Sequence, residues 1–168
     1  SITMRTPKND EDLIVGLLFC EGIISKTSEI EKIEFLGDIV GKFDLKNKTI
    51  GLLGTGKIGS VMAKIMHGCG CKLLGFDIME NKKLMVDYQL EYVSMKELCK
   101  AADIISIHLP LNTETHHLID KTLIELMKPN AIIINTARGA VINTKDVIDA
   151  LVNEKISGLG MDVYEHEK

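Results

Sequence analysis

Three glycines and one acid are the residues of this sequence whose spacing most clearly predicts chemistry. Gly54, Gly56 and Gly59 follow an apolar run in a G-x-G-x-x-G pattern, and Asp77 comes 18 residues after Gly59. Such glycines allow a tight turn, let the backbone approach a pyrophosphate, and let the following helix pack closely on the strand. The start of that helix offers free N–H groups and positive dipole potential to phosphate. The pattern predicts a dinucleotide-binding loop.

Asp77 ends the next apolar run, where a carboxylate can accept hydrogen bonds from both hydroxyls of the adenosine ribose. A carboxylate at that place would also repel a 2′-phosphate, so we expect NAD rather than NADP. The alternative is a tight turn followed by an ordinary acid at the end of a strand. The order of strand, glycine turn, helix and acid favours the dinucleotide interpretation.

The elements that must position these residues alternate regularly from residue 49 onward. Short β-branched runs are separated by helix-like stretches, which is typical of parallel strands joined by crossover helices. Several runs are apolar throughout, as expected of strands covered on both faces. We therefore expect an α/β fold, a doubly wound parallel sheet of the Rossmann type. The expected strands are residues 49–54, 71–77, 91–93, 103–109, 131–137 and 156–163.

Helix signals lie between these runs. Apolar residues at helical spacing predict a helix over residues 57–67, with Gly68 as its stop. Ser94 and Glu97 have the spacing of a capping box. Two further expected helices run from an Asp120 cap to Met127 and, capped by Asn143 or Thr144, over residues 145–155.

Length and charge exclude several classes of function. The 168 residues, 45% of them hydrophobic, can bury one good core with a small appendage. The net charge of −4, with lysines scattered among acids, argues against nucleic acid as a partner. No apolar run is as long as a membrane span, and the first residues lack the layout of a secretory signal. We expect a cytoplasmic protein.

The cysteines and histidines predict no metal site. The cysteines lack paired metal-ligand spacing, and in a reducing cytosol we expect them to be small core residues. The adjacent His116 and His117 cannot share one helix face, which favours a solvated loop over a pair of ligands. The four cysteines are Cys20, Cys69, Cys71 and Cys99.

Three further polar clusters follow the later strands, at residues 106–119, 135–143 and 160–167. Ligands on open α/β sheets bind outside the carboxyl ends of the strands, so these clusters are candidates for one site. Together with the glycine pattern, residues from about 40 to 168 resemble the NAD-binding domain of the D-isomer-specific 2-hydroxyacid dehydrogenases. The runs "GKFDLKNKTIGLLGTGKIG" and "DVYEHE" are most similar to the D-lactate dehydrogenase branch.

This resemblance implies a reaction and the residues for it. Arg138, from "TARG", matches the arginine that holds the substrate carboxylate and polarises the keto oxygen, a role that suits a planar guanidinium. Glu167 matches the glutamate that orients a catalytic histidine. The implied reaction is hydride transfer from NADH to C2 of a 2-oxo acid such as pyruvate, with a general acid protonating the oxygen. Without the resemblance, Arg138 would be a loop arginine in a surface ion pair, and Glu167 one of several tail acids.

The resemblance also implies further cofactor contacts. Lys57 and Ile58 match positions facing the pyrophosphate. The other matched positions are Leu109, Pro110 and Thr115, along one wall of the cofactor, and Thr136, Ala137 and Asp162, around the nicotinamide ribose and ring.

The sequence departs from the family pattern at its end. The family's acid/base histidine lies beyond the glutamate, whereas this sequence stops at Lys168. We therefore expect a truncated chain without the substrate domain, whose turnover is absent or very slow. A non-catalytic NAD(H)-binding fragment is the alternative function. The sequence itself leaves the oligomeric state open, although the family dimerises through this domain and the resemblance therefore implies that a homodimer is possible.

The head of the chain has a different pattern. Residues 9–22 fit one amphipathic helix, and about residues 3–35 resemble a segment of the formate dehydrogenase accessory sulfurtransferases. Cys20 is expected to be buried in that helix rather than nucleophilic. A third possible function is thus a sulfur-transfer accessory fragment. The expected organisation is chimeric, with residues 1–36 a helical segment of different origin, 37–48 a connector and 49–168 the NAD-binding domain.

Overall fold

The computed structural model describes residues 45–165. The chain divides into two units, Ser1–Phe43 and Asp44–Lys168, and the described residues all belong to the second. The helix expected over residues 9–22, Cys20 and the segment 1–36 lie outside the described residues, as does most of the expected connector. Their predicted structure and origin stay predictions.

Six parallel strands form one sheet in the order β3-β2-β1-β4-β5-β6. β1 lies in the middle of this sheet, β2 and β3 follow in order on one side of it, and β4, β5 and β6 follow in order on the other side. The direction in which strands are added therefore reverses between β1 and β4. This is the strand order of a dinucleotide-binding fold, in which ligands bind where the direction reverses, between β1 and β4. The predicted fold class is confirmed. The strands are β1 Thr49–Leu53, β2 Lys72–Phe76, β3 Glu91–Tyr92, β4 Ile104–Ile107, β5 Ile132–Asn135 and β6 Gly158–Met161.

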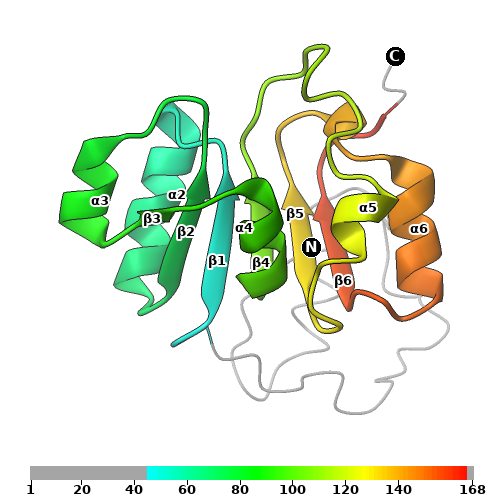
Figure 1. Ribbon diagram of the computed structural model, residues 1–168, viewed down its shortest axis with the longest axis horizontal. Helices are drawn as coiled ribbons and strands as arrows, with labels where there is room; N and C mark the ends of the chain where they lie inside the picture. Colours follow the sequence, from blue (N-terminus) through cyan, green and yellow to red (C-terminus); the bar gives the residue numbers. More distant parts are fainter. Residues whose placement is uncertain (1–44, 166–168) are drawn as a thin grey trace, which may run out of the picture. The chain divides into compact units, whose positions relative to one another are not determined.

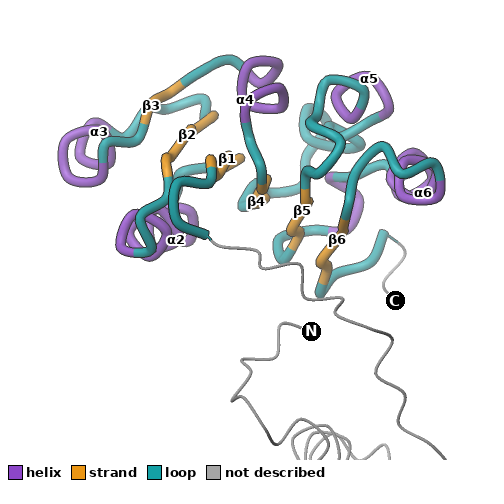
Figure 2. The backbone as a smooth tube through the Cα atoms, turned by 90° about the horizontal axis from the view of Figure 1, so that it is seen from below, coloured by secondary structure: helices purple, strands orange, loops and turns teal. Residues whose placement is uncertain are grey.

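Helices cover both faces of the sheet (Figures 1 and 2). α2 and α3 pack together on one face, while α4, α5 and α6 lie on the other. The change of face falls between β3 and β4, where the chain returns across the sheet. The helices are α2 Lys57–Gly68, α3 Lys82–Tyr88, α4 Met95–Ala101, α5 Lys121–Ile124 and α6 Thr144–Val152, with a short 3₁₀ turn, η2, at Gly139–Val141.

Two apolar cores result, one on each face. In β1, Ile50 and Leu52 pack in the α2 and α3 core, and Leu53 packs in the core under α4, α5 and α6. Because side chains alternate along a strand, a strand with helices on both faces must be apolar at every position. Gly51 is the exception, since a Cβ there would come 2.4 to 2.9 Å from the side chain of Leu98 on α4. The glycine lets α4 lie close to the central strand.

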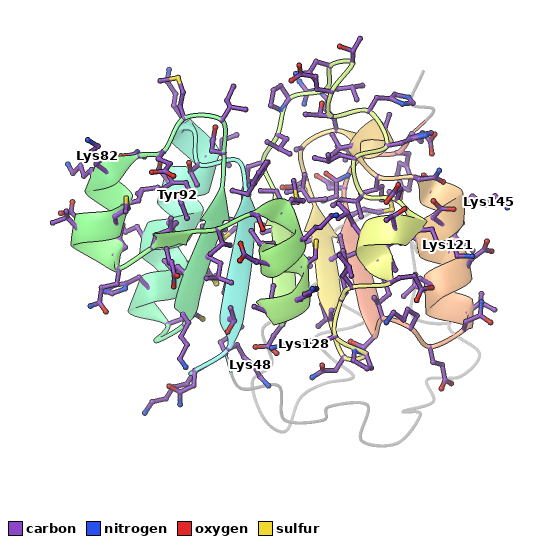
Figure 3. The ribbon with its side chains drawn as sticks, viewed as in Figure 1. Lys48, Lys82, Tyr92, Lys121, Lys128 and Lys145 are labelled. Carbon is purple, nitrogen blue, oxygen red and sulfur yellow. The ribbon has the colours of Figure 1, made fainter. Side chains whose placement is uncertain are left out.

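An ion pair between Asp103 and Lys128 lies at the amino-terminal ends of the strands. Asp103 accepts the Thr49 backbone N–H at 2.8 Å through Oδ2 and the Lys128 Nζ at 2.8 Å through Oδ1. Figure 3 labels Lys128 at the lower edge of the sheet. These groups stabilise the edge opposite the glycine loop.

Helix starts were predicted better than helix ends. Ser94 and Glu97 form the expected capping box, and Asp120 and Asn143 cap α5 and α6. The predicted end of α5 at Met127 is wrong, because the Met127 N–H bonds to the Ile124 carbonyl in a tight i→i−3 turn. The predicted stop at Gly68 is also wrong: Gly68 is the last helical residue and Gly70 takes the positive φ of +76°. α6 ends at Val152 rather than at residue 155.

The cysteine prediction is correct for two residues and wrong for a third. Cys71 and Cys99 are buried, and burial raises the pKa of the Cys99 thiol to about 11, which keeps it neutral. Cys69 is exposed because it follows the last turn of α2. Among the described helices, none has the length and apolar character that crossing a bilayer requires.

Candidate functional site

The glycine loop joins β1 to α2 at the carboxyl end of the sheet. Gly54 has φ +92°, a conformation that side chains with a Cβ rarely adopt. A Cβ on Gly59 would overlap the carbonyl oxygen of Gly54, so the start of α2 packs directly on the turn. At Gly56, by contrast, a Cβ would meet nothing within 4 Å. Backbone is therefore open to a ligand at the second glycine.

The N-terminus of α2 differs from those of the other described helices. Gly56 is its N-cap and gives no side-chain hydrogen bond, and the first turn contains no acid. The first N–H groups of α2 thus lack protein acceptors, as a pyrophosphate site requires. Lys57 and Ile58, the first two helical residues, are exposed, with Ile58 71% accessible. The other helices are capped by the side chains of Asn81, Ser94, Asp120 and Asn143.

Asp77 follows β2 and bonds to the glycine loop. Its Oδ2 accepts the Thr55 backbone N–H at 2.6 Å and the Thr55 hydroxyl at 3.1 Å, and its Oδ1 accepts the Met79 N–H at 3.1 Å. Partial burial raises the pKa of this carboxyl, but the hydrogen bonds from Thr55 and Met79 outweigh it and leave the pKa below its ordinary value. Asp77 is therefore held ionised next to the loop.

Sequence reasoning missed two residues beside Asp77. The Thr55 hydroxyl lies 2.7 Å from the Tyr92 hydroxyl, and Tyr92 accepts the Asn81 backbone N–H at 2.9 Å. Thr55 occupies a variable position of the glycine pattern, and Tyr92 lies in a strand of two residues. The one sequence feature that could have predicted the contact with Thr55 is a tyrosine at the end of a short edge strand.

The segment after β4 forms the next part of this edge. A Cβ on Gly54 would meet the His108 carbonyl oxygen at 2.8 Å and the Leu109 side chain at 3.1 Å, so this segment lies against the glycine loop. The Thr115 hydroxyl donates to the Pro110 carbonyl at 2.6 Å and closes the turn between them. The His108 Nε2 lies 3.0 Å from the Ser106 hydroxyl, and burial lowers the pKa of this imidazole.

The turn after β5 presents Arg138. Asn135, with 0% of its surface exposed, accepts the Ala137 N–H at 3.1 Å and donates to the Arg138 carbonyl at 2.9 Å. These two bonds fix the backbone of the turn, while Thr136 and the Arg138 side chain stay exposed. Asn135 is a further residue whose role the sequence did not reveal, because a buried asparagine at the end of a strand has no distinctive spacing.

The segment after β6 packs on the same turn. The Asp162 N–H bonds to the Asn135 carbonyl at 3.2 Å, and a Cβ on Gly139 would overlap the backbone of Tyr164 and Glu165. Gly139 therefore allows this segment to lie beside Arg138. Glu167 lies outside the described residues, so its predicted catalytic role stays a prediction.

His116 and His117 lie in the predicted loop, where His116 is exposed, but His117 is partly buried rather than solvated. Its Nε2 lies 2.5 Å from Glu165 Oε1, and its side chain is 33% exposed. Contacts with Thr144 and His117 lower the pKa of Glu165 to about 2. The pair links the segments after β4 and β6. Within residues 45–165, no group of three His, Cys, Asp or Glu side chains can hold a metal ion.

The described site residues lie at the carboxyl ends of five strands, on both sides of the reversal between β1 and β4. A cavity of about 730 Å³ lies elsewhere, between α6 and the edge strand β6, and its lining includes Ile148, Leu159 and Met161. Because the lining of this cavity includes no residue of the glycine loop, we do not assign the cofactor to it.

Comparisons with known proteins agree with this geometry. Residues 19–168 match the family described as D-isomer specific 2-hydroxyacid dehydrogenase, NAD binding domain. A D-lactate dehydrogenase of Staphylococcus aureus is 46% identical over 123 residues, covering 73% of this chain and 37% of that protein. A glyoxylate reductase of Thermococcus litoralis is 42% identical over 144 residues, covering 84% and 42%. The chain thus spans less than half the length of these relatives.

Solved structures give the same result. The D-lactate dehydrogenase with NAD⁺ from Lactobacillus jensenii aligns with a TM-score of 0.70 and 34% identity, covering 91% of this chain and 43% of that one. The D-lactate dehydrogenase from Aquifex aeolicus, complexed with NAD and lactic acid, gives 0.70 and 37%, covering 90% and 42%. The family match begins at residue 19, inside the segment that resembles a sulfurtransferase, and that second resemblance stays a prediction.

Proposed function

Because the chain belongs to the D-isomer-specific 2-hydroxyacid dehydrogenases through their NAD-binding domain, we propose that it serves the reduction of a small 2-oxo acid to a D-2-hydroxy acid. D-lactate and glyoxylate are the compounds that the names of its relatives give. The observation that carries the proposal is the common location of the glycine loop, Asp77 and the Arg138 turn. They lie at the carboxyl ends of strands of one sheet, on both sides of the point between β1 and β4 where the strand order reverses.

The first half of the sheet supplies the cofactor contacts. The uncapped start of α2 suits a pyrophosphate, and the open space at Gly56 leaves room for it. Asp77 is ionised and suits the ribose hydroxyls of NAD. Lys57 adds positive charge at the same helix start, and Ile58 leaves an apolar side chain exposed beside it.

The second half supplies substrate contacts. Arg138 is exposed at the end of β5, where its guanidinium can hold the carboxylate of a 2-oxo acid by two hydrogen bonds and polarise the keto oxygen. NADH, when bound, supplies the hydride that reduces C2. Glu167 is proposed from the resemblance to orient the histidine that gives the proton. The nicotinamide end is assigned to Thr136, Ala137 and Asp162, and the adjoining wall to Leu109, Pro110 and Thr115.

The test is a fluorescence titration of the purified chain with NADH, repeated with Asp77→Ala and Arg138→Gln. We expect saturable binding that Asp77→Ala weakens by about tenfold, as for loss of charged hydrogen bonds. Oxamate, a pyruvate isostere that is not reduced, should then change the fluorescence of the bound NADH. Arg138→Gln should abolish the oxamate effect while leaving NADH affinity within about twofold. No NADH binding, or an oxamate effect that survives in Arg138→Gln, would contradict the proposal.

Two further properties belong to the proposal. We propose a homodimer formed through this domain, which the exposed apolar side chains of Val61 and Ile65 on α2 support. Sedimentation of the chain, compared with a Val61→Lys variant, tests it. We also propose a cytoplasmic location, which the free thiols of Cys69 and Cys99 support.

A further inference from the structure

A hydrogen-bonded relay connects β3 to the carboxylate that faces the glycine loop. Tyr92 lies at the end of β3, and Figure 3 labels it toward the upper ends of β2 and β3. Its hydroxyl contacts the Thr55 hydroxyl at 2.7 Å, and Thr55 contacts Asp77 Oδ2 at 3.1 Å. Thr55 is only 3% exposed, so the middle of this relay is shielded from water.

The direction of the protons follows from the ends of the relay. An ionised carboxylate only accepts hydrogen bonds, so the Thr55 hydroxyl donates its single proton to Asp77. The Thr55 oxygen must then accept from Tyr92, whose own oxygen accepts the Asn81 N–H at 2.9 Å. Each donor is used once and points toward Asp77. Such a chain polarises each bond in turn and favours the ionised carboxylate.

The same tyrosine fixes the backbone on both sides of Asp77. Through Thr55 it holds the glycine loop, whose Thr55 N–H donates to Asp77 at 2.6 Å. Through the Asn81 N–H it holds the segment that follows Asp77 and enters α3. Room for the ring comes from Gly75 on β2, where a Cβ would lie 3.2 Å from the Tyr92 ring.

We propose that Tyr92, acting through Thr55, is a positioning residue that holds Asp77 in place to accept NAD and reject NADP. This inference rests on the proposed function, because it takes Asp77 as the residue that meets the adenosine ribose. A carboxylate held by donors from two segments cannot turn away from a 2′-phosphate. Loss of the Tyr92 hydroxyl leaves Asp77 its own bonds but removes the contacts that hold Thr55 and the Asn81 backbone in place. Asp77 is then held less firmly, which weakens its bonds to a ribose and its repulsion of a phosphate together.

The experiment titrates NADH and NADPH into the unaltered chain, Tyr92→Phe, Thr55→Val and Thr55→Ser. We expect Tyr92→Phe to raise the Kd for NADH about three- to tenfold, the effect of losing one hydrogen bond, and to leave the Kd for NADPH unchanged, because weaker binding of the ribose is offset by weaker repulsion of the phosphate. The preference for NADH then falls about three- to tenfold. Thr55→Val should act in the same direction, and Thr55→Ser, which keeps the hydroxyl, should stay within about twofold of the unaltered chain.

Ser60→Ala is the matched control. The Ser60 hydroxyl donates to the Thr55 carbonyl at 2.8 Å, so this variant loses a bond to the same loop without touching Asp77. We expect it to change both affinities by the same factor. Carboxyl ¹³C NMR of the cofactor-free chain gives a second measure, in which Tyr92→Phe should raise the pKa of Asp77 and Ser60→Ala should not.

The outcomes separate the two proposals. A Tyr92→Phe variant that binds both nucleotides as the unaltered chain does, or that weakens both equally, overturns the relay. If Asp77→Ala weakens NADH binding while Tyr92→Phe does not, the proposed function stands and the relay alone is wrong. If the unaltered chain binds no NADH, both are wrong.

Discussion

Replacing Asn135 by alanine should destabilise the domain far more than its position after a strand would suggest. The side chain is fully buried and bonds to two backbone groups of the Arg138 turn, the Ala137 N–H at 3.1 Å and the Arg138 carbonyl at 2.9 Å. Alanine leaves both groups without their partner. Each such orphaned group costs about 1–3 kcal/mol, so we expect a loss of roughly 3 kcal/mol in the free energy of unfolding.

Urea unfolding measures this loss directly. With a slope of about 2 kcal/mol/M, a loss of roughly 3 kcal/mol lowers the midpoint by about 1.5 M. Asn130→Ala is the matched control, because Asn130 is exposed and contributes only its backbone carbonyl, which accepts the Ser157 hydroxyl at 2.9 Å. Its midpoint should change by less than about 0.3 M, as for an ordinary surface substitution.

The result that would refute this reasoning is a midpoint for Asn135→Ala equal to that of Asn130→Ala. Asn135 would then be exchangeable, and the backbone of the Arg138 turn would have to be held by something else. A large loss of stability with an unchanged slope would instead locate the effect in the folded state.

Two other substitutions test separate parts of the site. Gly59→Ala places a Cβ against the carbonyl of Gly54, so it should lower the free energy of unfolding in urea by about 2 kcal/mol and lower NADH affinity. Gly68→Ala is the control and should be neutral or slightly stabilising, because a Cβ there meets no other atom. Equal effects at the two glycines would contradict the close packing of loop and helix. Glu165→Gln removes the contact with His117 and should lower the free energy of unfolding at pH 7. The loss should be only about 0.5 kcal/mol, because solvent screens this partly exposed pair. The pKa of Glu165 is lowered from its ordinary value of 4.5 to about 2 in the folded chain. The stability difference between Glu165→Gln and the unaltered chain should therefore be complete above pH 4.5 and vanish as the pH falls toward 2. A stability difference that persists at pH 2 would exclude the ionised Glu165 carboxylate as its source.

Local patterns in the sequence were sufficient for the sheet and for the helix starts. Six short runs predicted six strands, and several of them are apolar throughout because strands covered on both faces bury every side chain. The caps at Ser94, Asp120 and Asn143 were predictable since a cap bonds within three residues of itself. Helix ends were less predictable, as the early end of α5 shows. Whether the last turn of a helix tightens depends on packing more than on residue type. The helix α3 had no periodicity strong enough to be singled out.

The site residues could be predicted from the sequence, but the contacts that hold them in place could not. Spacing alone predicted the glycine loop and Asp77 as site residues, and resemblance added Arg138 and the remaining positions as predictions. The contacts that hold these residues in place could not be predicted, because they join distant parts of the chain: Thr55 to Tyr92, and His117 to Glu165. Whether two such polar side chains meet depends on strand order and register.

The sequence alone was therefore enough for the strands and most helices, and it predicted which residues carry the chemistry, since propensity, capping and glycine spacing act over a few residues. The tertiary structure alone decided which side chains support them. Only after β2 is paired with β1 and with β3 do Asp77, Thr55 and Tyr92 lie within hydrogen-bonding distance of one another. The physical reason is that a hydrogen bond requires donor and acceptor within about 3 Å, and for distant residues only the packed sheet brings them that close.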